Sequence, residues 1–233
     1  MSATVQRCTV CGGTTFTSER VLWESLIQEW QLSPSEAAYI DRQQGTRCVK
    51  CGCSLRSLAL AKAITSACGS AQTFHRWLRS PRTWMLRVLE LNGAGDLHRW
   101  LHRLPRYTAG QFPNVDMQAL PYADASFDLV LHSDTLEHVP DPMQGLCECH
   151  RVLRAGGWCC FTIPIVTQRL TRSRSGLPPS YHGQPTDEKH DFQVHTEYGS
   201  DFWEQVLAAG FDECRIVTVE FPSAQAIAAR KPL

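Results

Sequence analysis

Four cysteines near the amino terminus have the spacing of a metal site. They fall in two Cys-x-x-Cys-Gly motifs, which contain Cys8, Cys11, Cys48 and Cys51. Four thiolates grouped two and two are typical ligands of tetrahedral structural zinc, and the glycine after each pair lets the backbone turn tightly around the sulfurs. We therefore predict a zinc ribbon that binds Zn2+. Two unrelated exposed cysteine pairs, or a redox motif, are the alternatives.

A second group able to do chemistry is the sequence Asp134-x-x-Glu137-His138. Residues three and four apart share one face of a helical turn, so Asp134 can lie near both of the others. One hypothesis is a divalent-metal site. We favour the other, in which Glu137 and His138 cap or pack a helix, because a divalent cation needs more ligands than this loop supplies. His138 is also a candidate catalytic residue.

A third group lies in the long polar segment 167–201, which contains His182, His190 and Asp191. Connections of this length in a compact domain are usually functional lids or disordered segments. An imidazole titrates close to neutral pH, so either histidine is a candidate general base, and Asp191 could orient His190. The alternative is an ordinary polar loop with hydrogen-bonded histidines.

Apolar runs predict the elements that position these groups. Residues 85–91 and 127–131 are short β-branched and apolar runs typical of buried parallel strands. A helix over 143–153 follows, with Gly156-Gly157 as its left-handed cap, and 158–163 forms the next strand. Strand, helix and strand joined by short connections form a βαβ unit, so we expect a parallel sheet.

The ordered motifs of this region resemble the class I S-adenosylmethionine-dependent methyltransferases, specifically a type 11-like methyltransferase domain. The resemblance covers roughly residues 84–220. Its motifs are VLE before the small-residue loop NGAG, an aspartate before LP, then DASFDLV, LEHVPDP and RVLRAGG. It implies an α/β fold with a Rossmann-like, doubly wound and mostly parallel sheet, here with an amino-terminal zinc-ribbon and helical extension. It also implies S-adenosyl-L-methionine as cofactor.

The resemblance implies cofactor-binding residues wherever positions match. Glu90 would orient the loop and the methionine amine, Asp116 with the backbone of Met117 would bind the adenine amino group, and Ser133 would line the methionine end. The loop itself supplies Asn92, Gly93, Ala94 and Gly95.

One position departs from the family pattern. The family usually has an acidic residue after its second strand, here 106–110, to accept from the ribose hydroxyls. The nearest hydrogen-bonding group in this chain is Gln111. An amide accepts less strongly than a carboxylate, so we expect modest cofactor affinity or a ribose held through water.

The motifs divide the chain into three parts. Residues 1–56 form the zinc-ribbon module, with an inserted helix that begins at the capping box Ser33-Pro-Ser-Glu36. Residues 57–83 form a helical linker. Residues 84–233 form the methyltransferase domain, with a lid-like insertion at 165–200.

Charge and hydropathy exclude some function classes. The formal net charge is +0 at pH 7, which argues against nucleic acid or an anionic membrane as partner. No apolar window is long enough to span a membrane, and the first residues lack a signal core, so we expect a cytoplasmic protein. Arg76, Arg79, Arg82 and Arg87, interleaved with Trp77 and Trp84, form a local basic stretch. We favour a solvated helix face over a surface for an anionic substrate or RNA.

Three functions follow from the sequence. The first is O-methylation of a small molecule or saccharide in a biosynthetic pathway, because the ribbon and the segment HDFQVHTEYGSDF resemble methyltransferases of that kind. The second is an RNA base methyltransferase with a zinc ribbon, against which the neutral net charge speaks. The third is a non-catalytic binding protein on the same fold, suggested by the missing ribose-binding acid.

Overall fold

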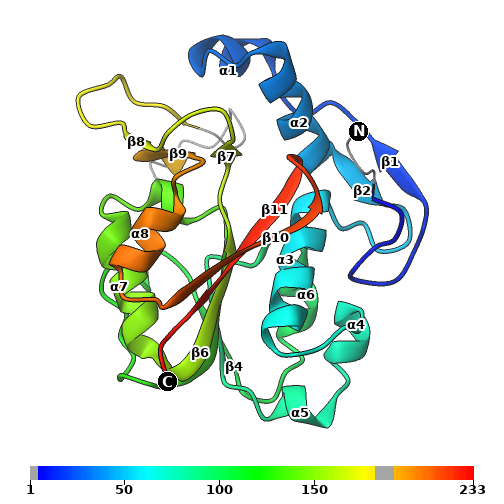
Figure 1. The fold of residues 1–233 in the computed structure, drawn as a ribbon, viewed down its shortest axis with the longest axis vertical. Helices are drawn as coiled ribbons and strands as arrows, with labels where there is room; N and C mark the ends of the chain where they lie inside the picture. The colour runs from blue at the N-terminus through cyan, green and yellow to red at the C-terminus, as the bar shows by residue number, and fades with distance from the viewer. Residues whose placement is uncertain (1–4, 182–191) are drawn as a thin grey trace.

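The computed structural model describes residues 5–181 and 192–233, and its centre is a six-stranded sheet (Figure 1). The strand order is β10-β11-β6-β5-β3-β4. The strands β3 (Val88–Leu91), β4 (Tyr107–Gly110), β5 (Phe127–Ser133) and β6 (Leu153–Thr162) are parallel neighbours. The predicted α/β fold with a mostly parallel sheet is confirmed.

Helices cover both faces of this sheet, which explains why its strands read as continuous apolar runs. Helix α3 (Leu55–Ala67) lies on one face, while α7 (Pro142–Val152) and α8 (Trp203–Ala208) lie on the other (Figure 1). Alternate residues of β5 face opposite sides. Leu129 and Leu131 join the apolar core with α3, and Val130 joins the core with α7.

The sheet ends in an antiparallel hairpin. Strand β10 (Glu213–Glu220) forms the edge, and β11 (Ala224–Arg230) lies between β10 and β6. Ala224, Ala226 and Ala228 are fully buried in the core that contains α3. Their small side chains leave room for α3 directly over the strand.

The helix α7 begins as expected but ends differently. The Asp141 side chain accepts from the Gln144 backbone N–H at 3.0 Å, and Pro142 occupies the first helical position. The prediction that Gly156 caps this helix is wrong. Leu153 already has extended dihedral angles, and Gly156, with φ of +70°, lies within β6.

Short elements connect the main ones. Between α3 and β3 lie α4 (Phe74–Trp77) and α5 (Pro81–Trp84). The crossover from β3 to β4 contains the 3-10 turn η1 (Gly95–Leu97) and the short helix α6 (His98–Leu101).

The amino-terminal part contains a two-stranded antiparallel ribbon with an inserted helical arm. Strands β1 (Phe16–Ser18) and β2 (Thr46–Cys48) pair, and between them lie α1 (Glu24–Glu29) and α2 (Pro34–Gly45). The predicted capping box is present: the Ser33 backbone N–H donates to Glu36 at 2.7 Å, and the Glu36 backbone N–H donates to the Ser33 hydroxyl at 3.3 Å. We call residues 19–45 the inserted arm.

The inserted arm packs on a second, three-stranded sheet. Its strands are β7 (Ile165–Val166), β9 (Thr196–Gly199) and β8 (Arg172–Ser173), in that order. Leu26, Trp30 and Leu32 of the arm form an apolar cluster with Val194. This sheet belongs to the segment predicted as a lid.

The arm also clamps the loop after β7 through polar contacts. The Arg169 guanidinium donates to both carboxylate oxygens of Glu36, at 2.9 and 3.0 Å, and to the Trp30 and Gln31 carbonyls. The predicted boundaries at residues 56 and 83 stay predictions. Among the helices described, none has the length and apolar character needed to cross a membrane.

Candidate functional site

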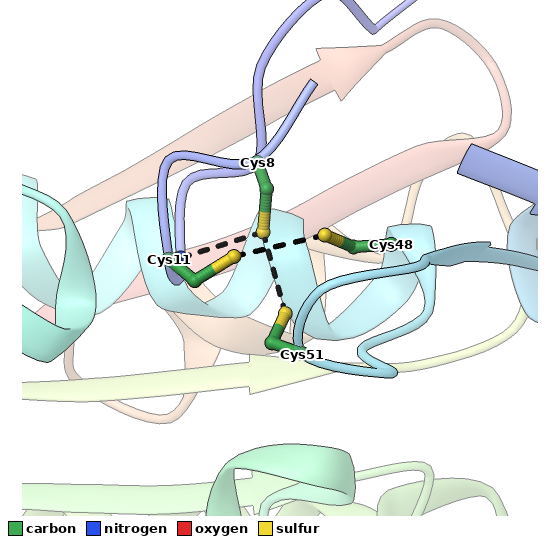
Figure 2. Close-up of side chains that lie close together, drawn as sticks. All are labelled: Cys8, Cys11, Cys48 and Cys51. Carbon is green, nitrogen blue, oxygen red and sulfur yellow. Dashed lines mark hydrogen bonds between the residues drawn. The ribbon is translucent and has the colours of Figure 1, made fainter. Parts of the chain in front are cut away.

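The four predicted zinc ligands converge on one point (Figure 2). Their sulfur atoms all lie within 4.8 Å of one another, and the Cys8–Cys51 and Cys11–Cys48 pairs are each 3.6 Å apart. Four sulfurs at roughly 2.3 Å from a tetrahedral zinc ion would be about 3.8 Å apart. The arrangement therefore fits a structural zinc ion, with all four coordination positions supplied by the protein.

Glycines shape the backbone around these sulfurs. Gly12 and Gly52 have φ of +78° and +72°, and their N–H groups donate to the carbonyls of Cys8 and Cys48 at 2.8 and 2.7 Å. Gly13 approaches the cluster even more closely. A Cβ there would lie 3.1 Å from the Cys48 sulfur, so the position accepts a side chain only if the cluster shifts.

Glu90 organises the loop that follows β3. It is 1% exposed, and its Oε1 accepts from the Ala94 backbone N–H at 2.5 Å. Its Oε2 accepts from His98 Nδ1 at 2.7 Å and from the Tyr107 hydroxyl. Burial, together with the Glu90 carboxylate, raises the pKa of Tyr107, which therefore stays a donor at neutral pH. Sequence reasoning found Glu90 but not these two partners.

The loop itself turns sharply and leaves room for a ligand at one position. Asn92 and Gly93 have φ of +53° and +83°, and the Asn92 side chain accepts from the Phe112 backbone N–H at 2.8 Å. A Cβ on Gly93 would meet no atom within 4 Å, whereas one on Gly95 would lie 3.3 Å from the Ser133 hydroxyl. Gly95 is needed for close packing, and Gly93 leaves the backbone open to a ligand.

Asp96, directly after this loop, connects it to the ribbon. Its Oδ2 accepts from the Ser54 backbone N–H at 2.8 Å and from the Ser57 hydroxyl at 2.9 Å. Arg47 Nη1 lies 3.2 Å from its other oxygen. Although burial acts to raise the pKa of Asp96, these hydrogen bonds lower it overall. Asp96 was missed because its partners are about 40 residues away, although an acid next to NGAG was a visible signal.

The remaining predicted cofactor-binding residues differ in their solvent exposure. Asp116 is half-buried, and its Oδ1 accepts from the Gln118 backbone N–H at 2.8 Å. Met117 is 2% exposed and packs against the α7 backbone at Gly145. Gln111 is exposed just beyond β4.

A polar network joins the ends of β5 and β6. The Ser133 and Thr162 hydroxyls are 2.7 Å apart, and Thr162 donates to Asp134 at 3.0 Å. Asp134 also forms an ion pair with Arg56, which comes from α3. Asp134 has φ of +46°, an uncommon conformation for a residue other than glycine. Arg56 was missed because only the packing of α3 brings it here.

Glu137 and His138 lie in the 3-10 turn η2 (Leu136–His138) after β5. Burial raises the pKa of Glu137 to about 8, so its proton is retained at neutral pH. Burial lowers the pKa of His138, whose Nδ1 lies 3.0 Å from the Gln193 carbonyl. A neutral imidazole must donate through Nδ1 in this contact, which makes Nε2 the basic nitrogen.

The metal hypothesis for these residues gains no support. In the part of the chain that the structure describes, the four cysteines are the group that converges as a metal ion requires, and Asp134, Glu137 and His138 are not. The other predicted catalytic residues, His182, His190 and Asp191, lie outside the described residues.

Comparison with known proteins identifies the central segment. Residues 64–161 match the family described as "Methyltransferase domain". A protein of Mycolicibacterium paratuberculosis, described as an uncharacterized methyltransferase, is 33% identical over 105 residues, which are 43% of this chain and 41% of the relative. One of Mycobacterium marinum is 48% identical over 125 residues, covering 52% and 46%. The chain thus spans less than half the length of either relative.

Solved structures show weaker likeness. An S-adenosylmethionine-dependent methyltransferase of Mesorhizobium loti has 17% identity and a TM-score of 0.41, covering 67% of this chain and 97% of that one. The Burkholderia thailandensis 1,6-didemethyltoxoflavin-N1-methyltransferase, solved with S-adenosylhomocysteine, has 19% identity and a TM-score of 0.41, covering 75% and 79%. Likeness at this level says nothing about the acceptor of this chain.

Proposed function

We propose that this chain is a class I S-adenosylmethionine-dependent methyltransferase that methylates a hydroxyl group of a small molecule or saccharide, a proposal supported by the matched methyltransferase domain and the methyltransferase relatives. The proposal rests on the contact between the segments that follow β3 and β5. The loop after β3 and the Ser133–Asp134 corner after β5 lie in contact at the carboxyl edge of a parallel sheet. Ligands of open α/β sheets bind at this edge.

Bound S-adenosylmethionine supplies an electrophilic methyl group, and the protein has to bind it, orient the acceptor and accept a proton. We assign the cofactor to the open backbone beside Gly93. Glu90 holds the loop through Ala94, and Ser133 borders the methionine end. We assign Asp116 to the adenine. Within the described chain its Oδ2 accepts one hydrogen bond, from the Gln118 side-chain amide at 3.3 Å, so this oxygen can still accept from the adenine amino group.

The acceptor side is assigned to Asp134, Arg56 and His138. A carboxylate and a guanidinium together offer acceptors and donors to hydroxyl groups, which supports a polar acceptor such as a saccharide. We assign His138 Nε2 the role of general base, because the contact of Nδ1 with Gln193 and the lowered pKa both favour a neutral, proton-accepting ring at pH 7. His182, His190 and Asp191 stay candidates for the same step.

Calorimetry tests the cofactor half of the proposal. We expect S-adenosylmethionine and S-adenosylhomocysteine to bind, and Glu90→Gln to weaken both by about tenfold or more, because the amide cannot accept from all three donors of the loop. Glu204→Gln, at an exposed position of α8, is the matched control and should leave binding unchanged. Absence of binding to the unmodified protein would support the non-catalytic alternative instead.

The acceptor half needs a separate assay. Incubation with labelled S-adenosylmethionine and pools of sugars, sugar phosphates and phenolic metabolites should transfer label to a hydroxyl-bearing compound. His138→Gln should lower kcat with little change in cofactor affinity, because the residue is assigned to proton transfer. Transfer of label to RNA but to none of the small molecules would overturn the proposed acceptor class.

A further inference from the structure

A groove of about 490 Å3 lies between α4, α5 and the segment around α6. Its lining includes aromatic rings, two arginines and one leucine: His75, Leu78, Arg79, Trp84, Trp100 and Arg103. The volume is in the range of pockets that bind small molecules. No residue of the proposed methyl-transfer site contributes to this lining.

The groove lies at the opposite edge of the sheet from the cofactor loop. Trp84 precedes β3, and Pro105, which also lines the groove, precedes β4. These two strands are parallel, so the residues before them share the amino-terminal edge. The loop 92–95 follows β3 and therefore lies at the carboxyl edge, about one strand length away. A ligand in the groove would not be the methyl acceptor.

The segment that supplies the groove lining, residues 71–106, is more basic than the chain as a whole. Residues 71–106 contain seven arginines but only two acidic residues, Glu90 and Asp96, and both acids are engaged elsewhere. Within the described chain, the guanidinium groups of Arg79 and Arg103 form no ion pair with any carboxylate. Unneutralised arginines at the rim of a pocket favour an anion, above all a phosphate.

Hydrogen bonds and ring contacts fix the orientation of the aromatic rings in the groove. The Trp84 indole is 48% exposed, yet its Nε1–H donates to the Leu78 carbonyl at 2.8 Å. Trp100 contacts the His75 ring edge-on, with centroids 4.6 Å apart, and the Arg99 guanidinium lies 4.2 Å from the Trp100 ring. An oriented, exposed indole beside arginines provides a stacking surface for a nucleobase. Trp77, by contrast, is 3% exposed and belongs to the core.

We propose that this groove binds a nucleotide, with the base stacked on Trp84 and the phosphate paired with Arg79 and Arg103. The size of the cavity suits one nucleotide, so the ligand is a free nucleotide or a nucleotide-linked metabolite. The site is separate from the cofactor site, and the proposal does not depend on the methyl acceptor.

Tryptophan fluorescence and calorimetry with UMP, UDP, AMP and ADP test the proposal on the full chain. We expect quenching that is lost in Trp84→Leu, and affinity that falls about tenfold or more in Arg79→Gln and in Arg103→Gln. Affinity should also fall as salt rises. The matched control is Arg76→Gln, which changes an exposed arginine of α4 that does not line the groove, and it should bind like the unmodified protein.

Further binding measurements distinguish the proposed groove from other sites that could produce the signal. Uridine and inorganic phosphate should each bind more weakly than UMP, and a saturating concentration of S-adenosylhomocysteine should not displace UMP. Displacement would mean that UMP occupies the cofactor site and would overturn the proposal. So would the absence of nucleotide binding. A single-stranded RNA bound over a hundredfold more tightly than any mononucleotide would replace the proposed ligand by a nucleic acid chain.

Discussion

Asp96 accepts a 2.8 Å hydrogen bond from the backbone N–H of Ser54, and this contact joins the loop after β3 to the amino-terminal ribbon. Ser54 follows Cys51 of the cysteine cluster by three positions and caps α3, while Asp96 directly follows Gly95 of the loop. Arg47, the neighbour of Cys48 in the cluster, lies 3.2 Å from the same carboxylate. The ribbon is therefore positioned to order the loop against which the cofactor would bind.

Replacement of this carboxylate should weaken cofactor binding without any contact to the cofactor. Asp96→Asn leaves Ser54 and Ser57 with a weaker acceptor, and we expect a loss of about 1–3 kcal/mol of stability together with roughly tenfold lower affinity for S-adenosylhomocysteine. Calorimetry and urea unfolding measure the two effects. The exposed Asp212→Asn is the control. Unchanged affinity in a destabilised Asp96→Asn protein would mean that the contact is structural only.

The cysteine cluster should bind about one equivalent of zinc, measured by elemental analysis of the purified protein. We expect Cys8→Ser combined with Cys48→Ser to abolish it, because only two thiolates would be left to hold the ion. Cys147→Ser changes an exposed cysteine outside the cluster and should retain full metal content. Zinc retained in the double variant would contradict the ribbon.

The Gly13 position offers a milder test of the same site. A methyl group there would press on the Cys48 sulfur at 3.1 Å, so Gly13→Ala should release zinc to a chelator faster than the unmodified protein does. Release followed with a colorimetric zinc indicator measures this. Gly145→Ala is the control for loss of a glycine, because Gly145 lies in α7 without a positive φ and a Cβ there would make only ordinary contacts of 3.4 Å or more. Equal release rates for all three proteins would show that the cluster tolerates the contact.

Glu137 should make stability fall as pH rises. Its pKa is about 8 in the fold, above the 4.5 of an ordinary glutamate, so the folded state binds more protons between these values. The group therefore destabilises progressively from pH 4.5 to pH 8, by up to about 1.4 kcal/mol per pH unit. Glu137→Gln should remove this slope in urea unfolding at pH 5.5 to 8.5. Glu204→Gln should keep it, and parallel curves for Glu137→Gln and the unmodified protein would refute the assignment.

Arg169 should be needed to hold the inserted arm against the second sheet. Glu36 is 5% exposed, so Arg169→Met leaves a buried carboxylate without its cation and should cost about 3–5 kcal/mol of local or global stability. Hydrogen exchange of α2 and β9 measures where the opening occurs. Arg20→Met removes a guanidinium that is 63% exposed and should have little effect. Glu36→Gln added to Arg169→Met should restore part of the loss.

Sequence patterns predicted the structure correctly where it depends on residues that are close together along the chain. The capping box at Ser33 needs only adjacent residues, and its prediction is confirmed. The spacing within each Cys-x-x-Cys-Gly motif is equally local, and the four cysteines do converge, while the zinc ion stays a prediction. The apolar runs that became β3, β5 and β6 identified a parallel sheet, because strands buried on both faces must be apolar throughout.

Where helix α7 ends and β6 begins was predicted less well. Two consecutive glycines suggested a cap, but β5 supplies a pairing edge that Leu153 can reach at once, since Leu153 pairs with Phe127. Strand pairing replaced the cap. The alanine-rich tail was equally ambiguous, because its small residues are suited to burial only once α3 lies over them.

The sequence alone predicted the fold class, the metal-site spacing of the four cysteines and the loop with Glu90 at the end of a strand. Which distant residues complete these sites depends on the tertiary structure. Asp96 meets Ser54, Arg56 meets Asp134, and Arg79 shares a groove with Arg103. Each of these contacts depends on how α3 and the short helices pack on the sheet. Side-chain periodicity specifies which face of a helix is buried, and it leaves open which polar groups that packing brings together.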